Sequence, residues 1–180
     1  MLNKNKNIKQ LIANIPNILT ISRLFLTFPL IIFLEINRPN FVFALIILGG
    51  ITDYFDGYFA RKFNLTTKFG AIIDPLSDKI FLLIPLLWLS KMEIIPFWSL
   101  AIILFRELII SALRTTKKDG LPASKLGKYK TFSFFIALVI FFQPFSIDLL
   151  SSLGITFYWL GFILTLITFI DYLRIKKNTI

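Results

Sequence analysis

Long apolar runs alternate with short polar connections along most of the 180 residues of the chain. A run of about 20 apolar residues can cross the roughly 30 Å hydrocarbon core of a bilayer as a helix. The pattern therefore predicts an all-α integral membrane protein with six transmembrane helices, at about 15–36, 41–61, 69–89, 94–113, 131–146 and 153–173.

Short polar segments flank this predicted membrane domain, which takes up residues 15–175. In residues 1–14, lysines accompany Ile8, Leu11 and Ile12, whose helical spacing predicts a short amphipathic segment on the membrane surface. A solvated tail is the alternative interpretation of these residues. Residues 176–180 form a basic C-terminal tail.

Basic residues are concentrated in the chain ends and connections that lie on one side of the predicted membrane domain. Three lie in the N-terminal segment, three between the second and third spans, six between the fourth and fifth, and three after the sixth. The alternate connections contain only Arg38 and Lys91. By the positive-inside rule, both chain ends face the cytoplasm. Membrane topology explains the formal net charge of +10 better than a nucleic-acid partner does, so we expect an inner-membrane protein that binds no nucleic acid.

Four aspartates stand between two apolar runs, where charge is costly and usually marks a functional site. On a helix, Asp53 and Asp56 lie one turn apart. Gly57, Ala60 and Arg61 lie on the same side of this helix, within an arc of about 140° that also contains the two acids. The next span carries a second pair of acids one turn apart, Asp74 and Asp78. Two helices joined by a short connection could point all four carboxylates at one another.

The composition restricts the chemistry of this acidic site. The chain contains neither cysteine nor histidine, which excludes thiolate and imidazole ligands, thiol nucleophiles and a serine–histidine triad. What remains is an all-oxygen site, suited to Mg²⁺, Mn²⁺ or Ca²⁺ rather than Zn²⁺. The small residues leave room for a ligand, and Arg61 supplies a guanidinium that matches phosphate oxygens.

Further polar residues lie inside or beside the apolar runs. Arg23 shares a face of the first span with Asn17 and Thr20, which indicates a substrate pocket, although a snorkelling arginine is the alternative. Arg106 and Glu107 in the fourth span indicate either substrate contact or a structural ion pair. The basic stretch 114–130 is either a plain cytoplasmic loop or a segment that folds back over a site.

These residues resemble a known family. From Asp53 to Asp78 the chain reads Asp-x-x-Asp-Gly-x-x-Ala-Arg, eight residues, Gly-x-x-x-Asp-x-x-x-Asp, which matches the signature of the CDP-alcohol phosphotransferases at every fixed position. Three other stretches resemble the branch that uses glycerol 3-phosphate as acceptor: Asn-Ile-Pro-Asn-Ile-Leu-Thr-Ile-Ser-Arg at 14–23, Phe-Arg-Glu-Leu-Ile-Ile-Ser-Ala-Leu-Arg at 105–114, and Ser-Lys-Leu-Gly-Lys-Tyr-Lys-Thr at 124–131.

The resemblance implies a reaction and a role for each signature residue. It implies that Asp53, Asp56 and Asp74 hold a pair of Mg²⁺ or Mn²⁺ ions against the pyrophosphate of CDP-diacylglycerol, and that Asp78 is the base and also touches a metal. The positions matching the CDP-binding part are Gly57, Ala60 and Arg61, to which we add Asp53, Asn17 and Thr20. The implied reaction gives phosphatidylglycerophosphate and CMP, in the lipid bilayer and at the cytoplasmic face, and the family suggests a homodimer.

The acceptor is less closely defined by the residues. Glycerol 3-phosphate is a dianion, so its pocket needs several cations, for which the candidates are Arg106, Arg114, Lys125, Lys128 and Lys130. Inositol phosphate, serine or phosphatidylglycerol is the acceptor in other branches. Two interpretations from other classes are a divalent-cation transporter, which would need acids near mid-membrane rather than near one end, and a scaffold protein, which would leave the four acids unexplained.

Overall fold

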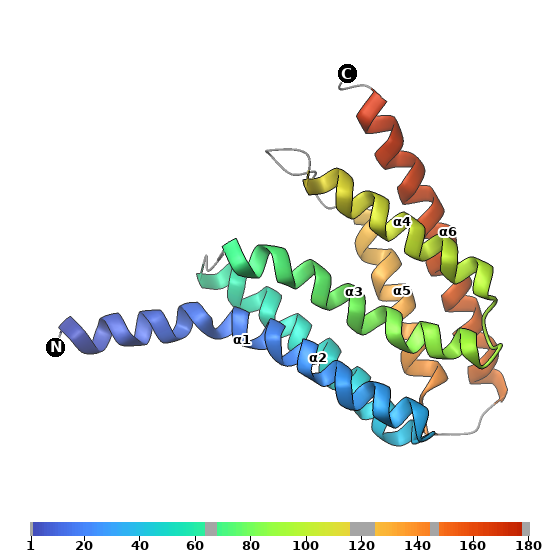
Figure 1. Ribbon diagram of the computed structural model, residues 1–180, viewed down its shortest axis with the longest axis horizontal. Coiled ribbons are helices and arrows are strands. Elements are labelled where there is room, and N and C mark those ends of the chain that lie inside the picture. Colours follow the sequence, from blue (N-terminus) through green and yellow to red (C-terminus); the bar gives the residue numbers. More distant parts are fainter. Residues whose placement is uncertain (1, 64–67, 116–124, 145–147, 178–180) are drawn as a thin grey trace. The chain divides into compact units, whose positions relative to one another are not determined.

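The computed structural model describes residues 2–63, 68–115, 125–144 and 148–177, and within these ranges it contains helices and turns but no strand. Figure 1 shows the helices in chain order. They are α1 (Leu2–Glu35), α2 (Pro39–Phe63), α3 (Lys68–Lys91), α4 (Phe97–Thr115), α5 (Lys125–Phe141) and α6 (Asp148–Lys177). The all-α class predicted from the apolar pattern is confirmed.

One helix, over Leu149–Arg174 of α6, is long and apolar enough to cross a membrane by length and composition, among the described residues. The six-span topology stays a prediction. The chain divides into two compact units, Met1–Pro85 and Leu86–Ile180.

Several helix boundaries differ from the predicted spans. Helix α5 begins at Lys125 rather than at about 131, because an apolar run marks the part of a helix that can lie in lipid, while lysine and leucine are also good helix formers. Helix α1 includes residues 2–14, so the segment predicted to lie on the membrane surface and the first span form one helix.

Two helix ends in the structure use a left-handed residue. After α1, Asn37 has a φ of 54°, its N–H donates to the Leu34 carbonyl (3.1 Å), and the N–H of Arg38 donates to the Phe33 carbonyl (2.9 Å). This is a Schellman motif, which satisfies carbonyls at the helix end. Pro39 then starts α2, where its missing N–H has no cost.

The same motif ends α3. Glu93 has a φ of 59°, its N–H donates to the Ser90 carbonyl (3.1 Å), and the N–H of Ile94 donates to the Leu89 carbonyl (3.0 Å). The chain is turned here, so α4 begins at Phe97 rather than at about 94, the predicted start of the fourth span.

In the first unit, α1 packs against α2, and the short connection between them requires the two helices to be antiparallel neighbours. Their buried side chains include Leu30 and Ile46, and Phe33 stacks on Phe41 with ring centroids 4.8 Å apart. Gly49 lies directly beneath the ring of Phe81 on α3, where an added Cβ would be 2.2 Å from the ring. A side chain at this position would push Phe81 out of place.

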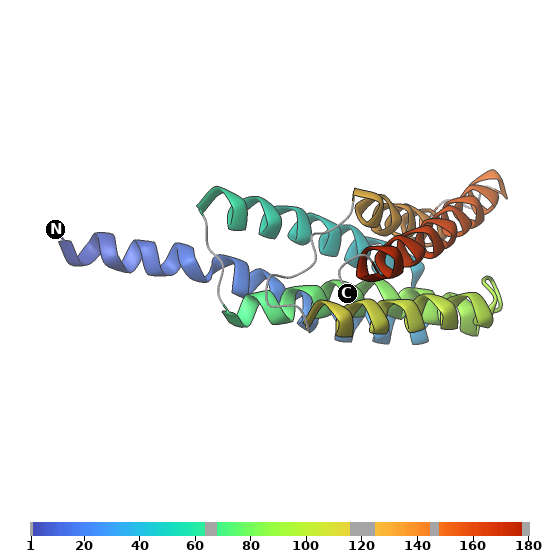
Figure 2. The ribbon, with the colours of Figure 1, turned by 90° about the horizontal axis from the view of Figure 1, so that it is seen from above.

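In the second unit, α5 and α6 pack closely along their length, and α4 packs against α6 (Figures 1 and 2). Gly161 allows the contact between α5 and α6, because a Cβ there would be 2.8 Å from the ring of Phe134. Ser99 on α4 and Tyr158 on α6 share a buried hydrogen bond of 2.5 Å. Small residues and paired hydroxyls therefore set how closely these helices approach.

Candidate functional site

One buried arginine connects the three helices of the first unit. The Nη1 atom of Arg23 on α1 lies 3.3 Å from Oδ1 of Asp53 on α2, and it donates a hydrogen bond to Oδ1 of Asp78 on α3. The arginine side chain is 2% exposed, whereas the two carboxylates are 62% and 45% exposed. The guanidinium is thus inside the unit, and the carboxylates face outward from it.

One hydroxyl group next to this arginine connects α3 to α1, and a second one bonds within α1. Ser77, which precedes Asp78 on α3, donates to the backbone carbonyl of Thr20 on α1 at 3.3 Å. Thr27 donates to the backbone carbonyl of Arg23 at 3.1 Å. These three hydroxyl-bearing residues are buried. The Ser77 contact therefore links α3 to α1 next to the pair formed by Arg23 and Asp78, whereas the Thr27 contact lies within α1.

The structure describes part of the predicted acidic site. It brings together the first and last signature acids, which are 25 positions apart in the printed sequence. Six predicted residues have side chains outside the described part of the structure: Asn17, Asp56, Gly57, Ala60, Arg61 and Asp74. Among the described side chains, no group of three acids gathers as a metal site. Thr20 is buried on α1, within one turn of Arg23.

The described donor set fits a divalent cation. Carboxylate oxygens from two helices already converge on one positively charged nitrogen, so Asp53 and Asp78 present anionic oxygen at a common place. Hard oxygen donors of this kind are the ligands that Mg²⁺ and Mn²⁺ prefer. With the two undescribed signature acids, these residues could hold such an ion.

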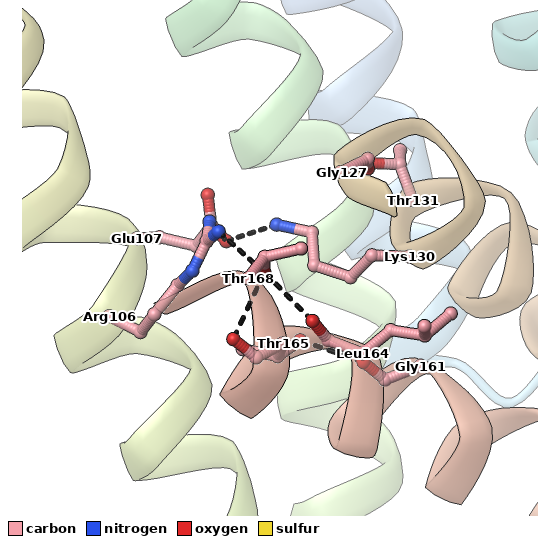
Figure 3. A network of polar contacts seen from close by, with 9 residues as sticks. All are labelled: Arg106, Glu107, Gly127, Lys130, Thr131, Gly161, Leu164, Thr165 and Thr168. Carbon is pink, nitrogen blue, oxygen red and sulfur yellow. Dashed lines mark hydrogen bonds and ion pairs between the residues drawn. The ribbon is translucent and has the colours of Figure 1, made fainter. Parts of the chain in front are cut away.

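A second polar cluster joins the three long helices of the second unit (Figure 3). Arg106 on α4 donates from Nη1 to Oε1 of Glu107 at 2.8 Å and from Nη2 to Oγ1 of Thr168 on α6 at 2.7 Å. Lys130 on α5 donates to the same Oε1 of Glu107. The guanidinium of Arg106 also lies over the ring of Tyr172, 5.8 Å from its centroid. Arg106 and Lys130 are both buried.

The structure describes the side chains of three of the five predicted acceptor-binding cations. Arg106 and Lys130 come together on one carboxylate, and Lys128 is exposed. The side chains of Arg114 and Lys125 lie outside the described residues. The ion pair considered for Arg106 and Glu107 is present, and Lys130 joins it from another helix.

Sequence reasoning missed the contribution of α6. Thr168 and Tyr172 contact Arg106 across more than sixty positions of sequence, and neither is among the candidate residues named from the sequence. A signal was present in the spacing, because Gly161, Thr165, Thr168 and Tyr172 recur at intervals of one helical turn and form one buried stripe.

Comparison with known proteins defines the class. The model of the CDP-alcohol phosphatidyltransferase family matches residues 13–167, so the chain belongs to this family, as its aspartate signature predicted. This family generally depends on a divalent metal ion.

Similar proteins come from one branch of the family. The chain is 35% identical over 174 residues to a protein of Rickettsia felis, with 92% of this chain and 96% of that protein covered. It is 34% identical over 178 residues to one of Haemophilus influenzae (93% and 95% covered), and 37% identical over 152 residues to one of Cereibacter sphaeroides (78% and 68% covered). All three bear the name CDP-diacylglycerol–glycerol-3-phosphate 3-phosphatidyltransferase.

Proposed function

We propose that this protein transfers the phosphatidyl group of CDP-diacylglycerol to glycerol 3-phosphate and releases CMP. The observation that carries the proposal is the convergence of Asp53 and Asp78 on Arg23, because it brings together the first and last acids of the family signature. The names of relatives that match nearly the whole chain support glycerol 3-phosphate as the acceptor.

In this reaction Asp78 takes a proton from the attacking hydroxyl of glycerol 3-phosphate. The hydroxyl oxygen forms a bond to the phosphorus that carries diacylglycerol, the bond from that phosphorus to the CMP oxygen breaks, and CMP leaves with the electron pair. Arg23 orients the Asp78 carboxylate from its buried position between the helices. A carboxylate can act as the general base if it lies within hydrogen-bond reach of the hydroxyl.

The other acids of the signature hold the metal in this proposal. Asp53, Asp56, Asp74 and Asp78 would bind two Mg²⁺ or Mn²⁺ ions, which would supply positive charge that offsets the charge of the pyrophosphate and the leaving CMP. The residues that would bind the CDP part are Asn17, Thr20, Asp53, Gly57, Ala60 and Arg61.

The phosphate of the acceptor needs cations of its own. We assign this role to Arg106 and Lys130, together with Arg114, Lys125 and Lys128. Two of these charges meet on Glu107, which supports the assignment because converging donors are what a phosphate group requires.

We further propose that the six helices are membrane spans, with the acidic site at the cytoplasmic face of an inner membrane and a homodimer as the assembly. The distribution of basic residues supports the orientation. Large exposed apolar side chains on α1 and α4 support contact with lipid, among them Phe25, Phe28, Phe105 and Leu108.

The test is CMP release by the purified protein in detergent with CDP-diacylglycerol, Mg²⁺ or Mn²⁺, and a panel of acceptors. We expect glycerol 3-phosphate to be the only acceptor in the panel that supports CMP release. An Asp78→Asn variant should fold and be inactive, while Glu93→Gln, a change at the exposed turn after α3, should retain activity.

Two outcomes would contradict the proposal in different ways. Release with serine or inositol phosphate instead would leave the family intact and replace the acceptor. If no acceptor supports release while divalent ions still bind to the protein, transport of a divalent cation becomes the better explanation of the acidic site.

A further inference from the structure

The strongest observation outside the acidic site concerns the hydroxyl of Thr168. Its oxygen lies 2.8 Å from the carbonyl of Leu164 and 3.1 Å from that of Thr165, both on α6. A carbonyl can only accept, so the single hydroxyl proton points at one of these two backbone oxygens. The lone pairs of the Thr168 oxygen are therefore directed away from the helix backbone.

Arg106 uses this fixed acceptor. Its Nη2 donates to Thr168 Oγ1 at 2.7 Å, and its Nη1 donates to Glu107 at 2.8 Å. Two hydrogen bonds from different nitrogens, one on each side, fix the plane of a guanidinium. The ring of Tyr172, one turn further along α6, lies against the same group. Arg106 is thus held by contacts to α6 as well as by a contact to its own helix.

Glu107 brings the second cation to the same place. Lys130 and Arg106 both donate to Oε1 of this carboxylate, so two positive charges from α4 and α5 meet at one oxygen atom (Figure 3). Like charges this close would repel and separate if no anion stood between them. The carboxylate oxygen therefore marks a point at which anionic oxygen is favoured.

Arg106 also keeps one donor that the described residues do not use. Its Nε atom is buried and has no hydrogen-bond partner among them. A buried donor that stays unsatisfied destabilises the structure that contains it. An oxygen of a bound anion would satisfy it without disturbing the contacts to Glu107 and Thr168.

We propose that Thr168 and Glu107 are positioning residues for the acceptor: they hold Arg106 and Lys130 together before the phosphate of glycerol 3-phosphate binds. The inference rests on the proposed function, since it assigns these cations to that phosphate. Thr168 lies outside the signature and beyond residues 13–167, the part of the chain that the family model matches.

This arrangement reduces the conformational entropy that the two cations lose when the acceptor binds. Long basic side chains lose rotamer freedom when a ligand immobilises them, and this loss weakens binding. Here α6 and Glu107 have already restricted both cations. Glycerol, which lacks the phosphate, gains nothing from this arrangement, so the cluster favours a phosphorylated acceptor.

The chain provides a matched control for a test. Thr165 lies on the same helix, is 0% exposed as Thr168 is, and donates in the same way to a carbonyl four residues back, that of Gly161 at 2.8 Å. Its hydroxyl does not contact Arg106. Replacement of either threonine by valine removes a buried hydroxyl from α6, but only one replacement releases the guanidinium.

We expect Thr168→Val to raise the KM for glycerol 3-phosphate by about tenfold, which corresponds to ~1.4 kcal/mol. The KM for CDP-diacylglycerol and kcat should stay within about twofold, because the change acts through ground-state binding of one substrate. Thr165→Val should leave both KM values unchanged, and Thr168→Ser, which restores the hydroxyl, should restore the KM for glycerol 3-phosphate. Inhibition by inorganic phosphate should weaken in parallel with the change in KM.

Several results would overturn the inference. If Thr168→Val and Thr165→Val have the same KM for glycerol 3-phosphate, Thr168 does not position the acceptor site. If Thr168→Val raises both KM values and lowers the melting temperature, its role is only structural. If the unaltered protein releases no CMP with glycerol 3-phosphate, the proposed function itself has failed, and this is seen before any variant is compared.

Discussion

The two polar clusters of this protein have opposite charge arrangements. In the first unit the buried guanidinium of Arg23 contacts two carboxylates whose side chains are about half exposed. In the second unit one carboxylate, that of Glu107, serves two buried cations. The first cluster therefore presents anionic oxygen outward, as a metal site requires, and the second collects positive charge inside, as a phosphate site requires.

The comparison also shows what each central residue does. Arg23 stabilises two acids that would repel each other, and Glu107 does the same for two cations. A buried ion cluster is weak evidence for stability, because the cost of removing charges from water offsets most of their attraction. We therefore expect substitutions in the two clusters to differ mainly in which kinetic or binding constant they change.

The largest expected effect separates kcat from KM. Asp78→Asn should lower kcat by about 10²–10⁴, because it removes the proposed base. Glu107→Gln should instead raise the KM for glycerol 3-phosphate and leave the KM for CDP-diacylglycerol close to its original value. Steady-state CMP release with each substrate varied in turn measures both constants. A loss of kcat alone in Glu107→Gln would remove the functional difference between the clusters.

The next effect concerns the metal. Addition of Mn²⁺ to chelator-treated protein should raise the melting temperature. An ion at 100 times its Kd raises the free energy of unfolding by about 2.7 kcal/mol. Asp53→Asn should abolish most of this rise, and Glu107→Gln should keep it, because only the first cluster offers converging carboxylates that face outward. Equal losses in the two variants would show that metal binding is not confined to the acidic cluster.

A smaller effect is expected at Arg23. Arg23→Gln should lower the free energy of unfolding by about 1–3 kcal/mol, the usual cost when a buried hydrogen-bonded partner is lost. Because the two carboxylates then lack their shared cation, added Mn²⁺ should stabilise this variant more than the original protein. Arg23→Lys keeps the positive charge but not the planar guanidinium, so its stabilisation by Mn²⁺ should lie between those of Arg23→Gln and the original protein. Identical metal stabilisation in all three proteins would mean that Arg23 does not balance the acids.

The smallest effect lies outside both clusters and serves as their reference. Glu93→Gly should raise the free energy of unfolding by about 0.5–1 kcal/mol, because glycine adopts the positive φ of the α3 end without strain. Thermal unfolding should detect the increase, and the kinetic constants should not change. A change in either KM would show that this turn is coupled to one of the clusters.

Sequence and structure contributed different parts of this account. Fixed spacing from Asp53 to Asp78 was enough to identify the family, and the apolar pattern was enough for the all-α class. Six membrane spans and the roles of the site residues stay predictions. The ends of helices were less certain, since the start of α5 at Lys125 depends on helix propensity and not on hydropathy.

What the sequence did not provide is the partner of each charge. Arg106 and Glu107 are neighbours in sequence, but Lys130 and Thr168 reach them from other helices. A threonine in an apolar run is usually satisfied by its own helix backbone, as Thr165 is, so the spacing of Thr168 indicates a buried position but not its contact with Arg106. Such contacts depend on how helices pack, which periodicity does not determine.

The contacts of Arg23 have a consequence for the order in which the chain assembles. Helices α1 and α2 are joined by a tight turn at Asn37, and contacts between elements close in sequence form fast. Asp53 therefore becomes available to Arg23 as soon as this hairpin closes. Asp78, 55 residues from Arg23, arrives only after α3 has been synthesised. The hairpin of α1 and α2 thus contains a counter-ion for the buried arginine before α3, which bears the proposed base, packs against it.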